Sequence, residues 1–443
     1  MHKYSVLLRL GLTVVLSAMM FSAAPAQKEG NWVDLDRIVG NVKIVNFGED
    51  SHFLTGVHQH VAQMFEHLVE EKGFRVFVFE AAWNTEEAFA DFMKSDRTTL
   101  TPEESFYLNA FNSKAIVEMM IWIRDWNRKH LNDKIRVTGF QPEQPVTDFN
   151  ALWDFAGKSE KFAAANLKSQ AAVCRSGTGE FKTNIEFIVD TSKRRRNNQL
   201  TYTTEERAAC NQAINAIDAF IEQNKKELIK KNSLNAYLEA GAHITSLRTY
   251  VNTLTYVLDQ SVINKKPTKE EGRALQRKAY GEGDKARFEI FEILRKTRFK
   301  DKKIFFWMHN WHAMKHSDET EVVGADDLPS GTISVGTRMA AAYGKNMVVI
   351  GNMVPKVNCK LPRCSVPDTP DSLETKFAQR FGNSPALVDL RNPPASDKDL
   401  PINSVGSLFA NVHEGHFENV VLSRQFDAIY YLPESGVTFE EQK

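Results

Sequence analysis

The chain has 443 residues, and its 56 basic and 56 acidic side chains give it a formal net charge of zero. Its composition, 42% hydrophobic and 25% charged, is that of a globular protein and excludes a disordered chain, a collagen and a polytopic membrane protein. A neutral chain offers no basic surface to phosphate backbones, so we expect no nucleic-acid partner. The length allows two or three units of domain size.

Residues 1–26 have the pattern of a cleavable secretory signal. Lys3 and Arg9 precede the apolar stretch 10–21, which is followed by the small residues Ser-Ala-Ala-Pro-Ala. The apolar stretch is shorter than the roughly 20 residues that a membrane span needs. We therefore predict cleavage after Ala26, a periplasmic or secreted protein, and no stable membrane insertion.

Export makes disulfides possible for the four cysteines. Cys359 and Cys364 bracket a short turn that contains proline, and Cys174 and Cys210 both lie in a helical part of the chain. We predict the bridges Cys174–Cys210 and Cys359–Cys364, although four cysteines allow three connectivities. The spacing of the cysteines matches no zinc-finger pattern.

The first block, residues 27–150, reads as the first part of an α/β domain. Runs rich in β-branched and aromatic residues at 41–47 and 74–79 predict buried strands. Between them apolar residues recur at helical spacing until Gly73, where the helix is expected to end. A strand–helix–strand unit implies that the two strands are parallel.

Two helices and one strand complete this block. A helix is expected to start near Asn84, with Glu87 three residues later as in a capping box. A second helix is predicted over 114–129, followed by a strand at 135–140.

The middle block, residues 151–299, has no pattern typical of a strand. Long helical patterns with polar faces cover 203–231, 234–260 and 268–296. They predict an all-helical subdomain inserted into the α/β domain. The basic run 193–196 is expected in a solvated loop between helices.

The third block, residues 300–443, returns to the α/β pattern. We predict strands at 304–308, 347–350, 386–390 and 427–432 and a loop at 391–403. The expected fold is therefore α/β, with a mostly parallel central sheet flanked by helices and the helical subdomain inserted between its two parts.

Residues able to do chemistry follow several of the predicted strands. Glu49 and His52 follow the first strand, Glu80 the second, Gln141 the third, and His309 with His312 the strand at 304–308. In open α/β sheets ligands bind outside the carboxyl ends of the strands. We therefore expect these side chains to share one edge of the sheet.

This set of residues suits the activation of water. A carboxylate such as Glu49 or Glu80 can orient His52 as a general base, while His309 and His312 can hold a substrate carbonyl or a developing oxyanion. The chain has no Gly-x-Ser-x-Gly, no Ser-x-x-Lys and no P-loop or dinucleotide fingerprint. A hydrolase without a covalent nucleophile and without a cofactor is the expected class.

A metal-dependent hydrolase is the alternative on the same residues. His52, His309 and His312 with a glutamate would satisfy a zinc or manganese shell. The chain has no His-Glu-x-x-His motif, and its nearest imitation, residues 413–416 (HEGH), is expected to be a surface loop. The histidines of the first helix, at positions 58, 60 and 67, are expected to be ordinary residues of the helix face.

With these motifs the sequence resembles the erythromycin esterase family. The matching segments occur in the family's order over most of the mature chain: 48–53 (GEDSHF), 77–81 (FVFEA), 122–127 (WIRDWN), 309–312 (HNWH), 334–351 and 426–431 (FDAIYY). The resemblance implies an α/β core with a helical subdomain and metal-independent hydrolysis of esters such as macrolide lactones, the reaction behind one form of antibiotic resistance.

The resemblance also implies roles for single residues. His52 would be the general base, and Glu49 and Glu80 would support or position it. His309 and His312 would line the substrate site. Arg124 and Trp311, which lie in the matching motifs, and Gln141, which follows the third predicted strand, are expected to contact the substrate. No metal ligand is implied.

Three positions depart from the family pattern. Val61 stands where the family has an arginine, Gln141 where it has an aspartate, and Gly283 before Asp284 where it has an arginine. Loss of two guanidinium groups and one carboxylate would change the electrostatics around the base. These departures favour a further alternative, a periplasmic binding protein that kept the scaffold and lost the chemistry. The substrate and the oligomeric state are not indicated by the sequence.

Overall fold

The computed structural model describes residues 32–323, 330–358, 369–412 and 415–438. The predicted signal at 1–26 and the predicted bridge Cys359–Cys364 lie outside these ranges. Residues from Trp32 onward form one compact unit. No helix in the ranges that the structure covers is long and apolar enough to cross a membrane.

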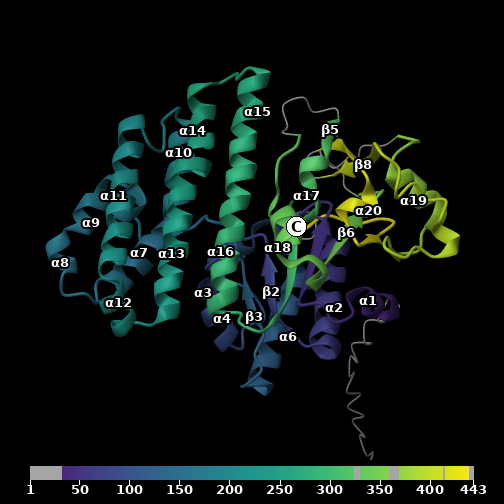
Figure 1. Cartoon of the computed structure of the whole chain (residues 1–443), viewed down its shortest axis with the longest axis horizontal. Coiled ribbons are helices and arrows are strands. Elements are labelled where there is room, and N and C mark those ends of the chain that lie inside the picture. The colour runs from purple at the N-terminus through teal and green to yellow at the C-terminus, as the bar shows by residue number, and fades with distance from the viewer. Residues whose placement is uncertain (1–31, 324–329, 359–368, 413–414, 439–443) are drawn as a thin grey trace, which may run out of the picture. The chain divides into compact units, whose positions relative to one another are not determined.

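A seven-stranded sheet forms the centre of this unit, in the order β3-β2-β4-β1-β6-β10-β7. Its strands β2, β3 and β6 are labelled in Figure 1. Its strands, in chain order, are β1 (Ile44–Glu49), β2 (Phe74–Phe79), β3 (Arg136–Thr138), β4 (Lys303–His309), β6 (Met347–Met353), β7 (Ala386–Asp389) and β10 (Ala428–Tyr431). All neighbours are parallel except β7, which runs antiparallel to β10. The predicted fold class, a mostly parallel sheet flanked by helices, is confirmed.

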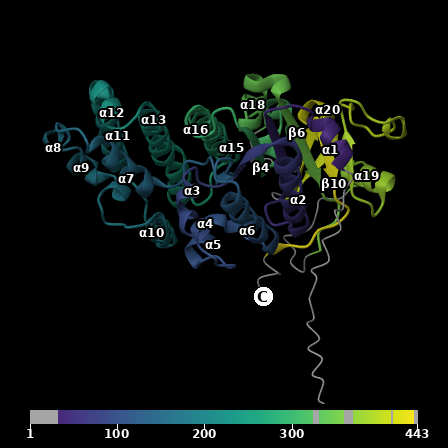
Figure 2. The same ribbon diagram turned by 90° about the horizontal axis from the view of Figure 1, so that it is seen from below.

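The alternation of side chains along each strand divides the core between the two faces of the sheet. One face carries Phe77 and Phe305 and packs against α1 (Trp32–Val39), α2 (Thr55–Lys72) and α6 (Lys114–Lys129). The other face carries Val78 and Phe306 and packs against α16 (Gly283–Thr297), α18 (Val335–Tyr343) and α19 (Leu373–Phe381). Figure 2 shows α2 and α6 on one side of the sheet and α16 and α18 on the other.

Helix α2 occupies the stretch that its apolar spacing predicts. It ends at Gly73, which has a φ of 74° and caps the helix in the left-handed conformation. His58, His60 and His67 face the core of the unit and are buried. His60 stacks on Tyr430 and His67 on Trp32, so these imidazoles pack as aromatic rings.

The predicted capping box at Asn84 does not form. The helix here is the short α3 (Thr85–Ala88), and the Asn84 side chain makes no capping hydrogen bond. Three further short helices follow before α6: α4 (Ala90–Lys94), α5 (Pro102–Leu108) and the 3₁₀ turn η1 (Asn109–Phe111). Helix α6 has the predicted bounds, and the hydroxyl of Ser113 caps it by accepting the Ile116 N–H.

The chain between β3 and β4 is helical and contains no strand, as its pattern predicts (Figure 1). Its helices are α7 (Pro145–Ala156), α8 (Phe162–Ala165), α9 (Leu167–Gln170), α10 (Asn184–Arg196), α11 (Thr204–Gln223), α12 (Lys225–Lys231), α13 (Leu234–Thr249), α14 (Thr255–Ile263), α15 (Lys269–Arg277) and α16, with short 3₁₀ turns η2 (Ala171–Val173) and η3 (Arg175–Gly177). The disulfide Cys174–Cys210 is present in their common core, as predicted.

Several expectations for this helical region are wrong in detail. The predicted helix at 203–231 is divided at Asn224 into α11 and α12. The predicted helices at 234–260 and 268–296 are each interrupted by a π-helical segment, η4 (Tyr250–Leu254) and η5 (Lys278–Glu282). At η4 the hydroxyl of Thr255 donates to the carbonyls of Tyr250 and Val251 and so competes with the regular backbone ladder. The basic run 193–196 forms the last turn of α10 instead of a loop, where its charges favour the negative end of the helix dipole.

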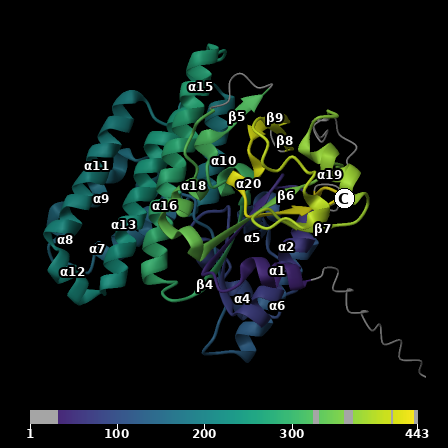
Figure 3. The same ribbon diagram turned by 45° about the vertical axis from the view of Figure 1, so that its right-hand side comes forward.

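A second, antiparallel sheet was not predicted. It has the order β5-β9-β8 and consists of β5 (Glu321–Val323), β8 (Ser407–Asn411) and β9 (His416–Val420) (Figure 3). His416, expected on the surface, is buried at the start of β9 with its Nε2 3.6 Å from Glu418 Oε1. His413 and Glu414 of the same motif lie outside the described residues.

Candidate active site

The sheet brings the predicted residues together at the carboxyl ends of three neighbouring strands. In the β1–β4 pair Glu49 lies opposite His309, and β2 borders β4 on its other side, with Glu80 directly after its last residue. His52 follows β1 by three residues. His312 lies on α17 (Asn310–Ala313), the single helical turn that follows β4.

Close packing holds α17 against the end of β1. A Cβ added at Gly48 would lie 2.5 Å from Asn310 Oδ1 and 3.0 Å from its Cα, so only glycine fits there. The Asn310 amide in turn donates to the Asn352 carbonyl and accepts the Asn352 N–H, which ties α17 to β6. The turn that carries His312 is therefore fixed between two strands.

His52 and Glu49 form a tight pair. His52 Nδ1 lies 2.6 Å from Glu49 Oε1, and the Trp307 indole donates to Glu49 Oε2 at 2.8 Å. Glu49 is fully buried, and this burial raises its pKa to about 7 despite the hydrogen bond from His52. The His52 side chain keeps 18% of its surface exposed, so the pair presents its imidazole and not its carboxylate to solvent.

Glu80 lies at the centre of a second set of contacts. Its Oε1 accepts from the Gln141 amide at 3.1 Å and lies 3.3 Å from His312 Nε2. Its Oε2 accepts the His309 backbone N–H at 3.0 Å and lies 3.7 Å from His52 Nε2. Although burial opposes ionisation, the charges of His312, His52 and Arg287 hold the pKa of Glu80 well below its usual range.

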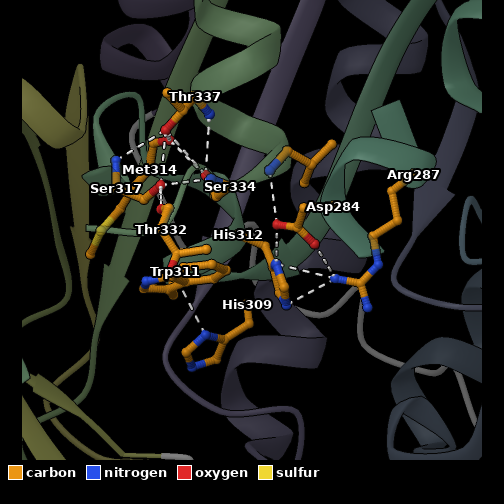
Figure 4. Close-up of polar contacts among 12 residues, drawn as sticks. Asp284, Arg287, His309, Trp311, His312, Met314, Ser317, Thr332, Ser334 and Thr337 are labelled. Atoms are coloured by element: carbon orange, nitrogen blue, oxygen red, sulfur yellow. Dashed lines mark hydrogen bonds and ion pairs between the residues drawn. The ribbon is translucent and has the colours of Figure 1, made fainter. Parts of the chain in front are cut away.

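Asp284 and Arg287 support this centre from α16 (Figure 4). Asp284 accepts from His312 Nδ1 at 2.7 Å, from the Val335 N–H at 2.8 Å and from Arg287 at 2.6 Å. The Arg287 guanidinium also lies 3.6 Å from Glu80. Sequence reasoning missed Arg287, because an Asp–x–x–Arg pair on a helix is also the ordinary pattern of a surface ion pair.

His309 lies beside His52, with the two ring centroids 5.8 Å apart. Its Nδ1 accepts the Trp311 backbone N–H at 3.3 Å (Figure 4). In a neutral imidazole this places the proton on Nε2, which is then a hydrogen-bond donor. The Trp311 indole packs against Tyr280 of η5, with ring centroids 5.3 Å apart.

The loop that carries His52 is held by main-chain contacts. His58 Nε2 lies 3.0 Å from the His52 carbonyl, and its Nδ1 lies 2.9 Å from the Ser113 hydroxyl. Burial lowers the pKa of His58 to about 3, so this ring stays neutral and acts as a spacer between the loop and α6. The Asp50 carboxylate accepts the N–H groups of Val354 and Val412 at 3.1 and 3.3 Å.

Residues that follow β10 close over the same loop. The Thr438 N–H donates to the Phe53 carbonyl at 2.9 Å, and the Thr55 N–H donates to the Gly436 carbonyl at 3.1 Å. The Gly56 N–H donates to the Ser435 hydroxyl at 2.9 Å. The segment between β1 and α2 is thus fastened by residues that follow β10.

A cavity lies next to the site, and a second cavity adjoins the first. The first has a volume of about 270 Å³ and is lined by Glu80, Ala81, Ala82, Phe106, Tyr107, Leu108, Phe111, Gln141, Glu143, Gln144, Asn184 and Ile188. The second, of about 430 Å³, shares Tyr107, Gln144 and Asn184 with the first. Because Glu80 and Gln141 line the first cavity, it borders the carboxylate that contacts His52.

Not every predicted residue belongs to this cluster. Arg124 is buried on α6, donates to the Arg97 carbonyl at 2.5 Å and lies over the ring of Phe92, so its described contacts are those of a packing residue. Val61, the first departure from the family pattern, lies in the hydrophobic core. A buried guanidinium is nevertheless present, supplied by Arg287, and Gln141 donates to Glu80 where a carboxylate would repel it.

Within the described ranges no three His, Cys, Asp or Glu side chains are arranged so that they could hold a metal ion. In a metal shell, imidazole nitrogens face the ion, whereas in this cluster they face carboxylates. His52 and His312 each contact a carboxylate through both ring nitrogens, so their nitrogens face proton acceptors.

The family model of the erythromycin esterases matches residues 69–435. The chain belongs to the erythromycin esterase family. The matched stretch contains Glu80, His309 and His312 and begins after the segment with Glu49 and His52. The family that the motifs predict is therefore confirmed.

Individual relatives are distant. The chain is 24% identical over 291 residues to a protein of Bacillus subtilis (strain 168) named "Putative hydrolase YbfO", a match that covers 64% of this chain and 59% of that protein. A crystal structure of a Bacillus cereus protein has a TM-score of 0.66 at 20% identity, with 92% of both chains covered. A mutant of the erythromycin esterase EreC in its open conformation has a TM-score of 0.62 at 15% identity, covering 91% of this chain and 94% of EreC. These structures share the fold.

Proposed function

We propose that the protein is an exported hydrolase that cleaves an ester or lactone with a water molecule activated by His52, without a covalent intermediate. The observation that carries this proposal is the fully buried Glu49 carboxylate 2.6 Å from Nδ1 of the partly exposed His52. A carboxylate there keeps the proton on Nδ1 and makes Nε2 the nitrogen that accepts one.

The reaction then follows from the arrangement. His52 Nε2 takes a proton from water as the water oxygen bonds to the acyl carbon, and the carbonyl electrons move onto its oxygen. The imidazolium is stabilised by Glu49 and by ionised Glu80, whose Oε2 lies 3.7 Å from Nε2. The Nε2–H of His309 is the donor for the oxyanion. When the carbonyl re-forms, the alkoxide leaves and takes the proton from His52.

The test is a hydrolysis screen read by mass spectrometry over macrolides and simple esters. The wild type is expected to give a product one water heavier, and His52→Ala to lower turnover at least about 10³-fold while keeping its fold. His130→Ala, an exposed histidine at the end of α6, is the matched control and should keep full activity. An unchanged rate in His52→Ala would overturn the proposal.

Further measurements address the alternatives. A metal-dependent hydrolase would lose activity in the same screen when a chelator is added, and elemental analysis would find bound metal in the purified protein. A binding protein would retain a candidate ligand with no change in the ligand's mass. Hydrolysis of a macrolide would extend the proposal to antibiotic resistance, and hydrolysis of simple esters alone would exclude that extension.

Export has its own measurement. Protein recovered from the periplasm or the medium is expected to begin at Gln27, as cleavage after Ala26 requires. N-terminal sequencing decides this, and a full-length chain beginning at Met1 that stays with the cytoplasm would contradict it.

A further inference from the structure

The side-chain amide of Asn84 is buried but makes no hydrogen bond to the described part of the chain. It is 1% exposed, and neither its Oδ1 nor its Nδ2 has a hydrogen-bond partner in the described part of the chain. The backbone on either side is fixed, because the Trp83 N–H donates to the Gln141 carbonyl, the Trp83 carbonyl accepts the Thr138 hydroxyl, and the Thr85 N–H donates to the Ala82 carbonyl. These bonds hold the main chain that carries the amide in place.

Gln144, which directly precedes α7, is a second buried amide with an unpaired nitrogen in the described part of the chain. It is 3% exposed, makes no capping hydrogen bond to α7, and its Nε2 has no partner among the described residues. Asn184 beside it behaves differently, since it accepts the Val146 N–H and donates to the Thr147 hydroxyl. A buried polar group without a partner is unfavourable and calls for a ligand or an ordered water.

Asn84 and Gln144 both line the cavity of about 430 Å³. We call this cavity the polar chamber; its other lining residues are Glu87, Ala88, Asp91, Arg97, Thr101, Glu103, Glu104, Tyr107, Thr147, Lys182, Thr183 and Asn184. Carboxylates outnumber cations in this lining, and Arg97 is already paired with Glu104 through both guanidinium nitrogens. The chamber thus disfavours an anion, and its hydroxyl and amide groups disfavour an apolar occupant.

The polar chamber adjoins the smaller cavity that Glu80 lines, and the two share Tyr107, Gln144 and Asn184. The smaller cavity is more apolar, with Phe106, Leu108 and Phe111 in its wall. A molecule that occupies both would place a polar group against Asn84 and an apolar group near Glu80 and the catalytic cluster.

We propose that the polar chamber is a subsite for a hydroxyl-rich group, a sugar or polyol, that forms part of the substrate. An amide supplies an acceptor and two donors side by side, which matches adjacent hydroxyls that both donate and accept. Tyr107 at the boundary offers an aromatic ring to the carbon skeleton of a sugar. The inference rests on the proposed function: the ester that His52 hydrolyses is attached to a glycosyl or polyol group.

The test compares two octanoate esters that differ in the alcohol: glucose esterified at its primary hydroxyl, and propanol. Asn84→Ala is expected to lower the ratio of kcat/KM between the sugar ester and the propyl ester about tenfold, mainly through KM, as one or two lost hydrogen bonds require. Gln144→Ala should act in the same direction. Asn235→Ala, an exposed asparagine on α13, is the control and should leave the ratio unchanged.

A binding measurement separates this inference from the proposed function. In the His52→Ala background, calorimetry of the two esters should show tighter binding of the sugar ester and loss of that preference when Asn84→Ala is added. If the wild type hydrolyses neither ester but this preference is found, the proposed function fails and the subsite stands. Equal binding of both esters, or no effect of Asn84→Ala on the preference, overturns the subsite.

A purely structural role for Asn84 gives a different result. If the amide only binds ordered water that holds the fold, Asn84→Ala lowers the melting temperature and weakens the binding of both esters equally. In that case the proposal is wrong. A hydroxyl-rich subsite predicts an unchanged melting temperature, because the side chain makes no hydrogen bond that the substitution would remove.

Discussion

At the scale of single residues, the proton shared by Glu49 and His52 has a measurable consequence. Burial raises the pKa of Glu49 to about 7, from an ordinary value of 4.5. The pKa of His52 is also raised, because Glu80 and Glu49 together outweigh the effect of burial. Both groups therefore hold their protons to higher pH in the folded protein than in the unfolded chain.

The first prediction concerns stability against pH. Between about pH 4.5 and 7 Glu49 holds a proton in the folded state that it has lost in the unfolded chain, so its contribution to the free energy of unfolding should fall as pH rises through this range. His58, which is neutral in the folded state, contributes in the opposite direction up to about pH 6.5 in both proteins compared below. In Glu49→Gln this fall should be smaller, and melting temperatures of both proteins from pH 4 to 8 would measure it. The lowered pKa of Glu80 acts in the opposite direction but only below about 4.5. Identical slopes for the two proteins would contradict the burial argument.

Glu49→Gln should also remove activity. The amide can donate to His52 Nδ1, which moves the ring proton to Nε2 and leaves no base facing the water. We expect kcat to fall at least about 10²-fold. A variant that is more stable near pH 7 yet inactive would separate the catalytic role of this carboxylate from any role in folding.

Arg287 carries the third prediction at this scale. It is the buried cation between Asp284 and Glu80, and Arg287→Ala leaves both carboxylates without it. We expect a loss of about 3 kcal/mol or more in the free energy of unfolding, measured with urea, and a large drop in kcat. Arg128→Ala removes an exposed ion pair to Asp96 and should change stability by less than about 1 kcal/mol. Equal effects in the two variants would refute the role of Arg287.

The residues at the strand ends could be predicted, but not how they are supported. Glu49, His52 and Glu80 were found because parallel strands end at one edge and because the motifs around them are specific. Arg287 and Asp284 reach the site from a helix, and nothing in a helical pattern tells which of its turns faces a catalytic cluster. The opposite error occurs at Arg124. It lies inside a matching motif and was predicted to contact the substrate, but its side chain lies over Phe92 and away from the described cluster.

At the scale of elements, the prediction worked where the pattern is local. The strand at 74–79 and the helix at 114–129 have their predicted bounds, because a run of β-branched and aromatic residues and a regular apolar spacing each fix the element alone. The sheet of β5, β8 and β9 was missed. Its strands contain Asn, Glu and His, and they become strands only by pairing with segments far away in the sequence.

The disulfide gives a prediction at the same scale. Cys174 and Cys210 close a loop with a sequence separation of 36 residues in the core of the helical region. Replacing both by alanine should lower the free energy of unfolding by about 3–4 kcal/mol, because the unfolded chain regains the freedom of that loop. Activity at temperatures below unfolding should be kept, since neither cysteine lines the described cavities. A loss of activity without loss of stability would contradict this.

At the scale of the whole molecule, the order of strands could not be derived from the sequence. β4 lies between β2 and β1 although the whole helical region separates it from both in the chain. That insertion is what places His309 beside Glu49 and brings the Glu80 carboxylate within reach of His52. Sequence patterns predicted the strands, and the pairing that makes the site comes from tertiary packing, which a single sequence does not display.

The fastening of the loop after β1 by residues that follow β10 has a consequence for the order of folding. Phe53, Thr55 and Gly56 are bound by Thr438, Gly436 and Ser435, which lie in the chain beyond every strand of the large sheet. The helices and most of the sheet can form before these contacts do, but the segment that carries His52 stays unfastened until the stretch after β10 has docked on it. The position of His52 therefore belongs to a late step of folding, although the residue itself lies early in the sequence.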